Sequence, residues 1–130
     1  MSILLKKSLT SIESAQALYE KKLYHSSVHC YYYSCIQLMR HILFNRLGFS
    51  EKDFDDNMQL SNSHNELINK IWEKITIDSD ARDFKIKIGS LKRMRKDADY
   101  KQIIIYQRDS EDAKQYATII NNNLKYIFLK

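Results

Sequence analysis

Hydrophobic residues recur along this chain at intervals of three and four positions, the spacing that gathers side chains on one face of an α-helix. The longest such pattern runs from about Ser26 to Leu47 and is followed by Gly48, a residue type that commonly ends helices. Its apolar rows contain Val28, Tyr31, Tyr32, Cys35, Ile36, Leu38, Met39, Ile42 and Leu43, with Arg46 at the end of the main row. Because these rows cover more than one side, we expect a central helix with neighbours on several sides.

A shorter helix is predicted before the central one. The segment Thr10-Ser11-Ile12-Glu13 fits a capping box and predicts a helix running to about Lys22, although the amphipathic pattern already begins at Leu5. Its inner stripe consists of Ile12, Ala15, Leu18 and Tyr19. A short connection follows, in which Ser26 or Ser27 is placed to cap the central helix. The two helices should form a tight antiparallel hairpin.

Three further helices are predicted in the second half of the chain. Residues 49–63 are polar and acidic, which predicts a long loop. Helices then begin at Ser63, at a cap formed by Asp78-Ser79-Asp80, and at Asp109. Their expected inner faces carry Leu67, Ile68, Ile71, Trp72, Ile75, Ala81, Phe84, Ile88, Leu91, Ala113, Tyr116, Ala117, Ile120, Leu124, Ile127 and Phe128. The run 103–106 has the composition of a strand without a partner strand, so we expect an extended segment packed on the core.

Composition favours the same fold class. The chain has 130 residues, no proline and two glycines, which predicts a single all-α domain, a compact bundle of about five helices around a long second helix. Its net charge of +5 favours polyanionic partners such as nucleic acids or nucleotide phosphates. The short apolar run before Lys6 is neither a signal peptide nor a membrane span, so a cytoplasmic location is expected. Cys30 and Cys35 point about 140° apart on one helix, which predicts two unpaired, buried thiols.

The stretch Leu91–Tyr100 is the most distinctive part of the sequence. It packs four cations, two carboxylates and a tyrosine into ten residues. On a helix, Arg95 and Asp99 stand four residues apart and share a face above the leading leucine, while Lys92 and Lys96 form an adjacent row. The simplest interpretation is a solvated helix end.

Several segments, taken in their order, resemble the HEPN superfamily. They are Ala15–Tyr19, Tyr24–Val28, Tyr31–Ser34, Ser63-His64 and Leu91–Tyr100. The resemblance implies a helical bundle that pairs as a homodimer, and the surplus apolar and tyrosine surface of the central helix favours the same association. Many members are metal-independent endoribonucleases of toxin, antiphage or CRISPR-linked systems, some with a cognate nucleotidyltransferase-type antitoxin. Others bind nucleotides or act as scaffolds, and no cofactor is implied.

The resemblance also points to candidate catalytic residues. Ribonuclease members carry an arginine, a polar residue and, a few residues later, a histidine. Arg95 and Lys96 match the first two positions, but Asp99 and Tyr100 stand where the histidine is expected. Aspartate and tyrosine ordinarily have pKa values of about 3.9 and 10, so each keeps one protonation state near neutral pH, unlike an imidazole. Asp99 could still orient Arg95 or act as a base, and Tyr100 could donate to a leaving oxygen.

Five residues are candidates for ligand binding. Lys92, Arg93 and Lys96 would contact phosphates beside the candidate arginine. Tyr33 would stack on a base or bond a phosphate, with a core position as the open alternative. His64 resembles a histidine at the start of the third helix in many HEPN sequences, and we favour structural capping over catalysis for it.

The remaining histidines and Tyr32 are interpreted structurally. His25 and His29 have a spacing that could chelate a metal, but a zinc site needs further ligands and Cys30 lies on a neighbouring face, so no metal site is predicted. These histidines are interpreted as polar residues near a helix start. His41 lies away from the apolar row and is predicted at the surface. Tyr32 is predicted in the core, with its hydroxyl satisfied locally.

Three functions remain open from the sequence. The favoured one is an RNA- or nucleotide-binding protein with weakened or lost ribonuclease activity and a basic site centred on Arg95. The second is an active endoribonuclease toxin whose site is shared across a dimer, with Asp99, Tyr100 or His64 replacing the missing histidine. The third is a non-catalytic dimerisation or partner-docking module, in which Arg95 and Asp99 only pair.

Overall fold

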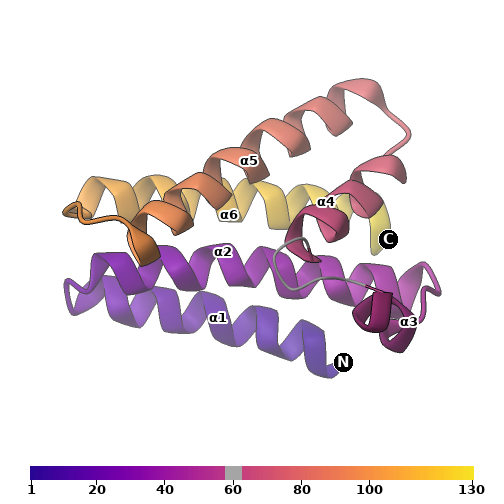
Figure 1. Cartoon of the computed structure of the whole chain (residues 1–130), viewed down its shortest axis with the longest axis horizontal. Coiled ribbons are helices and arrows are strands. Elements are labelled where there is room, and N and C mark those ends of the chain that lie inside the picture. Colours follow the sequence, from indigo (N-terminus) through magenta and orange to yellow (C-terminus); the bar gives the residue numbers. More distant parts are fainter. Residues whose placement is uncertain (58–62) are drawn as a thin grey trace.

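The computed structural model describes residues 1–57 and 63–130. Within these residues the protein has six α-helices and no strand, which confirms the all-α prediction. The helices are α1 (Ile3–Glu20), α2 (Tyr24–His41), α3 (Glu51–Asn57), α4 (Ser63–Glu73), α5 (Asp78–Tyr100) and α6 (Gln107–Phe128), and a π-helical turn, Ile42–Arg46, continues α2. Helices α1 and α2 form the predicted antiparallel hairpin, and α4, α5 and α6 lie on the opposite side of α2 (Figure 1).

Helix α2 is the centre of the bundle, as its apolar rows predicted. It contacts α1, α4, α5 and α6, and the nine apolar residues predicted for the central helix, seven in α2 and two in the π-helical turn, are all buried. Only Arg46, at the end of the main row, is exposed. Gly48 ends this segment with φ +78°, a left-handed conformation that glycine adopts without the strain of a Cβ. In the described part of the chain, no helix is long and apolar enough to cross a membrane.

Helix α1 begins well before the predicted capping box. The Ser2 hydroxyl accepts a hydrogen bond from the Leu5 backbone N–H at 3.1 Å, so the cap lies at the start of the chain. The Thr10–Glu13 box was therefore wrong as a helix start, and the earlier onset of amphipathicity near Leu5 was the better signal. The Ser11 side chain is instead bonded to Gln37 of α2 at 2.6 Å. A residue that fits a cap locally is thus used inside the helix to join two helices.

The predicted serine caps of α2 were also wrong. The helix starts at Tyr24 after an N-cap residue, Leu23, whose side chain caps nothing in the described structure. Ser27 lies one turn inside the helix, where its hydroxyl is bonded to that of Ser110 on α6. The predicted cap of α5 was wrong in the same way, because its N-cap residue is Ile77. Asp78 and Asp80 lie in the first turn of the helix, where the helix dipole favours carboxylates.

Part of the predicted long loop is helical. Helix α3 has Glu51 and Asp53 in its first turn, where the helix dipole favours carboxylates. Phe54 is buried and its ring lies 5.6 Å from that of Phe44. One buried aromatic residue and a favourable first turn are enough to hold a helix that composition alone predicted as a loop. The rest of that predicted loop, 58–62, lies outside the described residues.

The segment between α5 and α6 is extended but packs less than predicted. Ile103 and Ile104 are 56% and 72% exposed, and only Ile105 packs against the core. Helix α6 starts two residues earlier than predicted, with the Asp109 carboxylate accepting the Tyr106 backbone N–H at 2.8 Å.

Trp72 of α4 is exposed, although its helical position predicted a core residue. Periodicity identified these helices correctly, but it did not predict which residues of each apolar face are buried by neighbouring helices.

His41 and the cysteines show two smaller differences. His41 was predicted at the surface but is buried, with Nδ1 bonded to the Ser2 hydroxyl at 2.6 Å, because the start of α1 covers it. Burial, with the charges of Arg46 and the N-terminus, lowers the pKa of His41. Both cysteines are free as predicted, and burial raises the pKa of the Cys35 thiol to about 12. Cys30 is only partly buried.

Candidate functional site

Arg95 is enclosed by aromatic rings. Its side chain is 92% shielded from solvent, and its guanidinium carbon lies 4.8 Å from the ring centroid of Tyr32 and 5.8 Å from those of Tyr33 and Tyr100. These distances place the cation within reach of the negative faces of three rings. Its Nε atom is buried and has no hydrogen-bond partner among the described residues. The interpretation of this stretch as a solvated helix end is therefore wrong at Arg95.

Asp99 joins Arg95 to a histidine on another helix. Its Oδ2 atom lies 3.8 Å from Nη1 of Arg95, which confirms the predicted pair along α5. The same oxygen lies 2.7 Å from Nδ1 of His29 on α2. The His29 ring in turn packs on Tyr33, with centroids 4.6 Å apart. One carboxylate therefore holds both a guanidinium and an imidazole.

His29 was interpreted from the sequence only as a polar residue near a helix start. A signal was present, because His29 and Tyr33 stand four residues apart and must share a face of α2. That face could not be matched to Asp99 without knowing how α2 and α5 dock. The link between the two helices is a tertiary contact and has no local signature.

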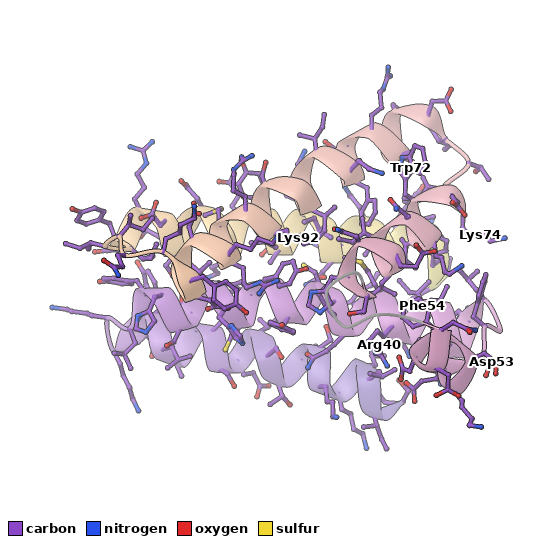
Figure 2. All side chains as sticks on the ribbon, in the orientation of Figure 1. Arg40, Asp53, Phe54, Trp72, Lys74 and Lys92 are labelled. Atoms are coloured by element: carbon purple, nitrogen blue, oxygen red, sulfur yellow. The ribbon has the colours of Figure 1, made fainter. Side chains whose placement is uncertain are left out.

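Most of the predicted site residues line one cavity. Its volume is about 330 Å³, and its described lining comes from α2, α4 and α5: Tyr33, Ser63, His64, Lys92, Arg95, Lys96 and Tyr100. Lys92 of α5, labelled in Figure 2, is hydrogen-bonded to Asn65 of α4. Arg93 was predicted as a ligand-binding residue, but it is exposed and is not among the described residues that line this cavity. Two residues from Arg95 on a helix, it points about 200° away.

His64 faces Tyr32 and Tyr33. Its Nδ1 atom is bonded to the Tyr32 hydroxyl at 3.0 Å, and its ring centroid lies 5.5 Å from that of Tyr33. Its ring therefore packs between α2 and α4, and the capping role expected for it stays a prediction. Burial lowers the pKa of His64 to about 4, and the charges of Arg95 and Lys92 act in the same direction. The imidazole is consequently uncharged at neutral pH.

The two tyrosines of α2 have different positions. Tyr32 is fully buried with its hydroxyl satisfied by His64, which confirms its predicted core role. Burial, the largest effect, raises its pKa, so the hydroxyl stays protonated at neutral pH. Tyr33, for which the sequence left two alternatives, is half-buried and lines the cavity. The tyrosine run therefore divides between the core and the candidate site.

The cavity has an excess of positive charge. Lys92, Arg95 and Lys96 contribute three cationic groups, and the described residues that line the cavity include no carboxylate. Burial lowers the pKa of Lys92, and the neighbouring charges of Lys96 and Arg95 lower it further. Burial and neighbouring positive charges both disfavour the charged form of a lysine. An anion entering the cavity would relieve this repulsion.

The structure offers little for a metal ion. Within 1–57 and 63–130, no group of three or more histidine, cysteine, aspartate or glutamate side chains is placed to hold one. Of the two histidines whose spacing could chelate a metal, His29 is bonded to Asp99. His25, the other member, lies close to Ser26.

No family model, curated protein or solved structure matches this chain. The resemblance to the HEPN superfamily therefore stays a prediction from sequence motifs. A function for the site has to follow from its own geometry and charge.

Proposed function

We propose that this protein binds RNA or a nucleotide by holding its phosphate in the cavity between α2, α4 and α5. The observation that carries the proposal is the convergence of Lys92, Arg95 and Lys96 on one cavity whose described lining includes no carboxylate. A guanidinium offers paired donors that match phosphate oxygens, and the lysines add mobile point charges. The pKa of Lys92 is lowered by burial and then by the charges of Lys96 and Arg95, and a bound phosphate would offset the second of these effects.

The aromatic residues of the cavity favour a nucleotide over free phosphate. Tyr100 is 75% exposed at the end of α5 and lines the cavity beside the cations. Its ring face is available to a base, and base stacking on aromatic residues contributes about 1–3 kcal/mol per base. Tyr33 supplies a second, half-buried ring on the opposite helix. A single-stranded nucleic acid offers bases that are free to stack in this way.

Salt-dependent RNA binding tests this function. A labelled single-stranded RNA should bind with an affinity that falls with salt, with a log–log slope of about −0.7 for each phosphate neutralised. Arg95→Ala should weaken binding and reduce the slope by about one contact, because one phosphate contact is lost. Asp99→Ala should leave binding unchanged or strengthen it, since it removes a negative charge near the phosphate. Fluorescence anisotropy between about 50 and 200 mM salt measures both quantities.

Arg93→Ala is the matched control for this experiment. It removes the same side chain from the same helix, but Arg93 is exposed outside the cavity. It should retain most of the affinity. Equal binding by wild type and Arg95→Ala, or equal losses in Arg93→Ala and Arg95→Ala, would contradict a phosphate site at Arg95.

A structural role for the same residues is the second candidate. Arg95 contacts Asp99 on its own helix and packs on Tyr32 of α2, so it also joins α5 to the bundle centre. If this is its only role, Arg95→Ala and Asp99→Ala should lower the free energy of unfolding by similar amounts, without a change in RNA affinity. Thermal unfolding of both variants, measured with the binding data, separates the two functions.

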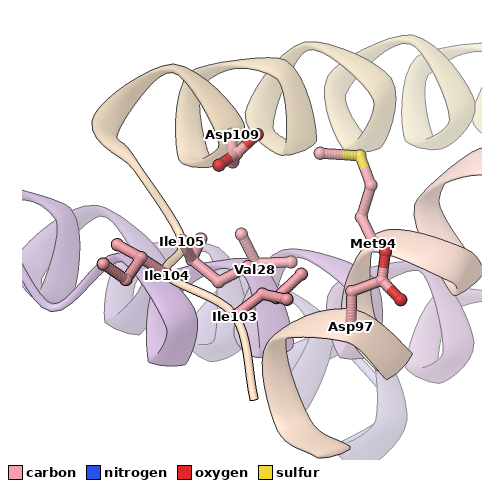
Figure 3. Close-up of a pocket in the computed structure, with 7 residues that line it drawn as sticks. All are labelled: Val28, Met94, Asp97, Ile103, Ile104, Ile105 and Asp109. Carbon is pink, nitrogen blue, oxygen red and sulfur yellow. The ribbon is translucent and has the colours of Figure 1, made fainter. Parts of the chain in front are cut away.

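We further propose that the chain forms a symmetric homodimer through the segment after α5. Exposed Ile103 and Ile104 line a small groove of about 90 Å³ together with Val28 and Met94. Figure 3 shows Val28 and the three isoleucines close together, with Asp97 and Asp109 at the edges of this group. Lys101 lies two residues before Ile103 in the sequence, so this surface carries exposed apolar side chains and both signs of charge. A two-fold contact needs such self-complementarity.

A further inference from the structure

The three cations of the candidate cavity lie on about one turn of α5. Lys92, Arg95 and Lys96 are three and four residues apart, so they occupy neighbouring positions on one side of the helix. All three line the same cavity of about 330 Å³. The charges of Lys96 and Arg95 contribute to the lowered pKa of Lys92, so the three groups are close enough to interact. They converge on one position and do not form a row along the surface.

The charge at this position fits a dianion better than a monoanion. The described lining of the cavity carries three cations and no carboxylate. Asp99, which is not among the described lining residues, lies 3.8 Å from Arg95 and offsets one of these charges. Two positive charges then remain for a ligand. A phosphate inside a nucleic acid strand carries one negative charge, whereas a phosphate monoester carries about 1.5 to 2 at pH 7.

Helix α4 adds to the positive potential of the cavity. Ser63 and His64 lie in its first turn and line the cavity, so the start of this helix borders it. The first turn of a helix carries the positive end of the helix dipole, which favours a bound anion. Glu66 lies in the same turn, but it is 3.6 Å from Lys70 and is not among the described lining residues. A second element therefore favours a highly charged anion at the position where the cations of α5 converge.

The burial of the cations indicates how a ligand would enter. Arg95 is only 7% exposed, whereas Lys96 and Tyr100 are exposed and line the same cavity. A phosphate that reaches Arg95 must therefore pass these exposed residues. An internal phosphate carries a nucleotide on both sides and would need a second exit for the strand. A terminal phosphate carries one nucleotide, whose base could stack on Tyr100 at the exposed side.

We infer that the cavity binds a terminal phosphate monoester, at the end of an RNA strand or on a single nucleotide, in preference to a phosphate inside a strand. The inference rests on the proposed phosphate-binding function and narrows its ligand. Proteins that bind the body of a single strand use a cationic groove that follows successive phosphates. The described cations of this cavity lie on about one turn of α5, so a single phosphate meets all of them.

Fluorescence anisotropy with three short RNAs of one sequence tests this inference. One RNA carries a 5′-phosphate, one a 3′-phosphate, and one has hydroxyls at both ends. At least one phosphorylated RNA should bind about 10- to 100-fold more tightly than the unphosphorylated one, the gain expected from one or two added charge-assisted hydrogen bonds. A methyl ester on that phosphate should remove most of the gain, because it blocks one oxygen and leaves a single negative charge. Competition by adenosine monophosphate, but not by adenosine, would identify a single nucleotide as a sufficient ligand, and its absence would identify the strand end.

Lys96→Gln and Arg93→Gln are a matched pair of variants for the same measurement. Both remove an exposed cation from α5, but only Lys96 is among the described lining residues. Lys96→Gln should reduce the preference for the phosphorylated RNA by about tenfold, because one charge-assisted contact with the terminal phosphate is lost. Arg93→Gln should keep the wild-type preference. Thermal unfolding of both variants should stay close to that of wild type, since both side chains are exposed.

The outcomes distinguish this inference from the function on which it rests. Equal affinity for all three RNAs, with binding that still depends on Arg95 and on salt, would overturn the terminal-phosphate inference and leave the phosphate site intact. An equal loss of preference in Lys96→Gln and Arg93→Gln would overturn the placement of the terminal phosphate in this cavity. The proposed function itself would fail if no RNA bound, or if Arg95→Ala bound all three as tightly as wild type.

Discussion

Individual side chains at this site are held mostly by residues from other helices. The contact between Arg95 and Asp99 could be predicted because both lie on α5, four residues apart. The contacts of Asp99 with His29, and of His64 with Tyr32, each cross between helices. They depend on how α2 docks against α4 and α5, which no local spacing determines. The sequence therefore identified the charged helix correctly but not the imidazole that faces it.

Acidification provides a prediction at the scale of one residue. The pKa of His64 is lowered from 6.5 to about 4 by burial and by the charges of Arg95 and Lys92. Between these values the unfolded chain binds a proton that the folded protein excludes, so the stability present above about pH 6.5 is lost as the pH falls toward 4. Because His64 is only half-buried, solvent screening reduces the expected loss to about 1–2 kcal/mol.

Urea unfolding at about pH 7 and pH 4.5 measures this loss in wild type and His64→Gln. The glutamine variant lacks the titrating group, so its stability should depend less on pH. His41 titrates in the same direction, since its pKa is also lowered. The decisive quantity is therefore the difference between wild type and His64→Gln in how much stability is lost between the two pH values. An identical loss in both would show that His64 contributes nothing to the pH dependence.

At the scale of helices, amphipathic periodicity predicted the existence of most elements and local signals predicted their ends poorly. The capping box at 10–13 fits the local rule, but α1 runs through it because packing against α2 continues on both sides. Helix α3 was missed because its single buried aromatic residue, Phe54, gives no repeating pattern. Tertiary burial decided both cases, and only a structure supplies it.

Core truncation tests how far the predicted stripes stabilise the bundle. Ile71 of α4 and Ile120 of α6 are 0% and 2% exposed. Replacing either with alanine should lower the free energy of unfolding by about 2–5 kcal/mol, since it removes buried methyl groups and leaves a cavity. Ile86→Ala is the control, because Ile86 is exposed on α5 and should change stability by less than about 0.5 kcal/mol. Chemical denaturation of the three variants provides the comparison, and a loss below about 1 kcal/mol at Ile71 or Ile120 would place that side chain outside the stabilising core.

At the scale of the whole molecule, the surplus apolar surface is not where the sequence placed it. The faces of α2 that favoured a dimer contact are covered by α1, α4, α5 and α6 of the same chain. Exposed apolar side chains gather instead at the end of α5 and directly after it, where Tyr100, Ile103, Ile104 and Tyr106 follow one another closely. Composition could predict that some apolar side chains would remain exposed on the folded chain, but not on which part of the molecule they would lie. Because Tyr100 also lines the cavity, a dimer contact through this segment would lie near the candidate site.

Sedimentation tests the homodimer. At micromolar concentration the protein should sediment at about twice the 15.5 kDa mass of the chain, since a stable interface of roughly 2,000 Å² would persist at that dilution. Ile104→Asp should shift the equilibrium to the monomer, because it introduces a charge into the apolar contact. Ile86→Asp adds the same charge at another exposed isoleucine, on the body of α5, and should remain dimeric. A wild-type monomer at this concentration would contradict association, and a dimer unaffected by Ile104→Asp would place the contact on a different surface.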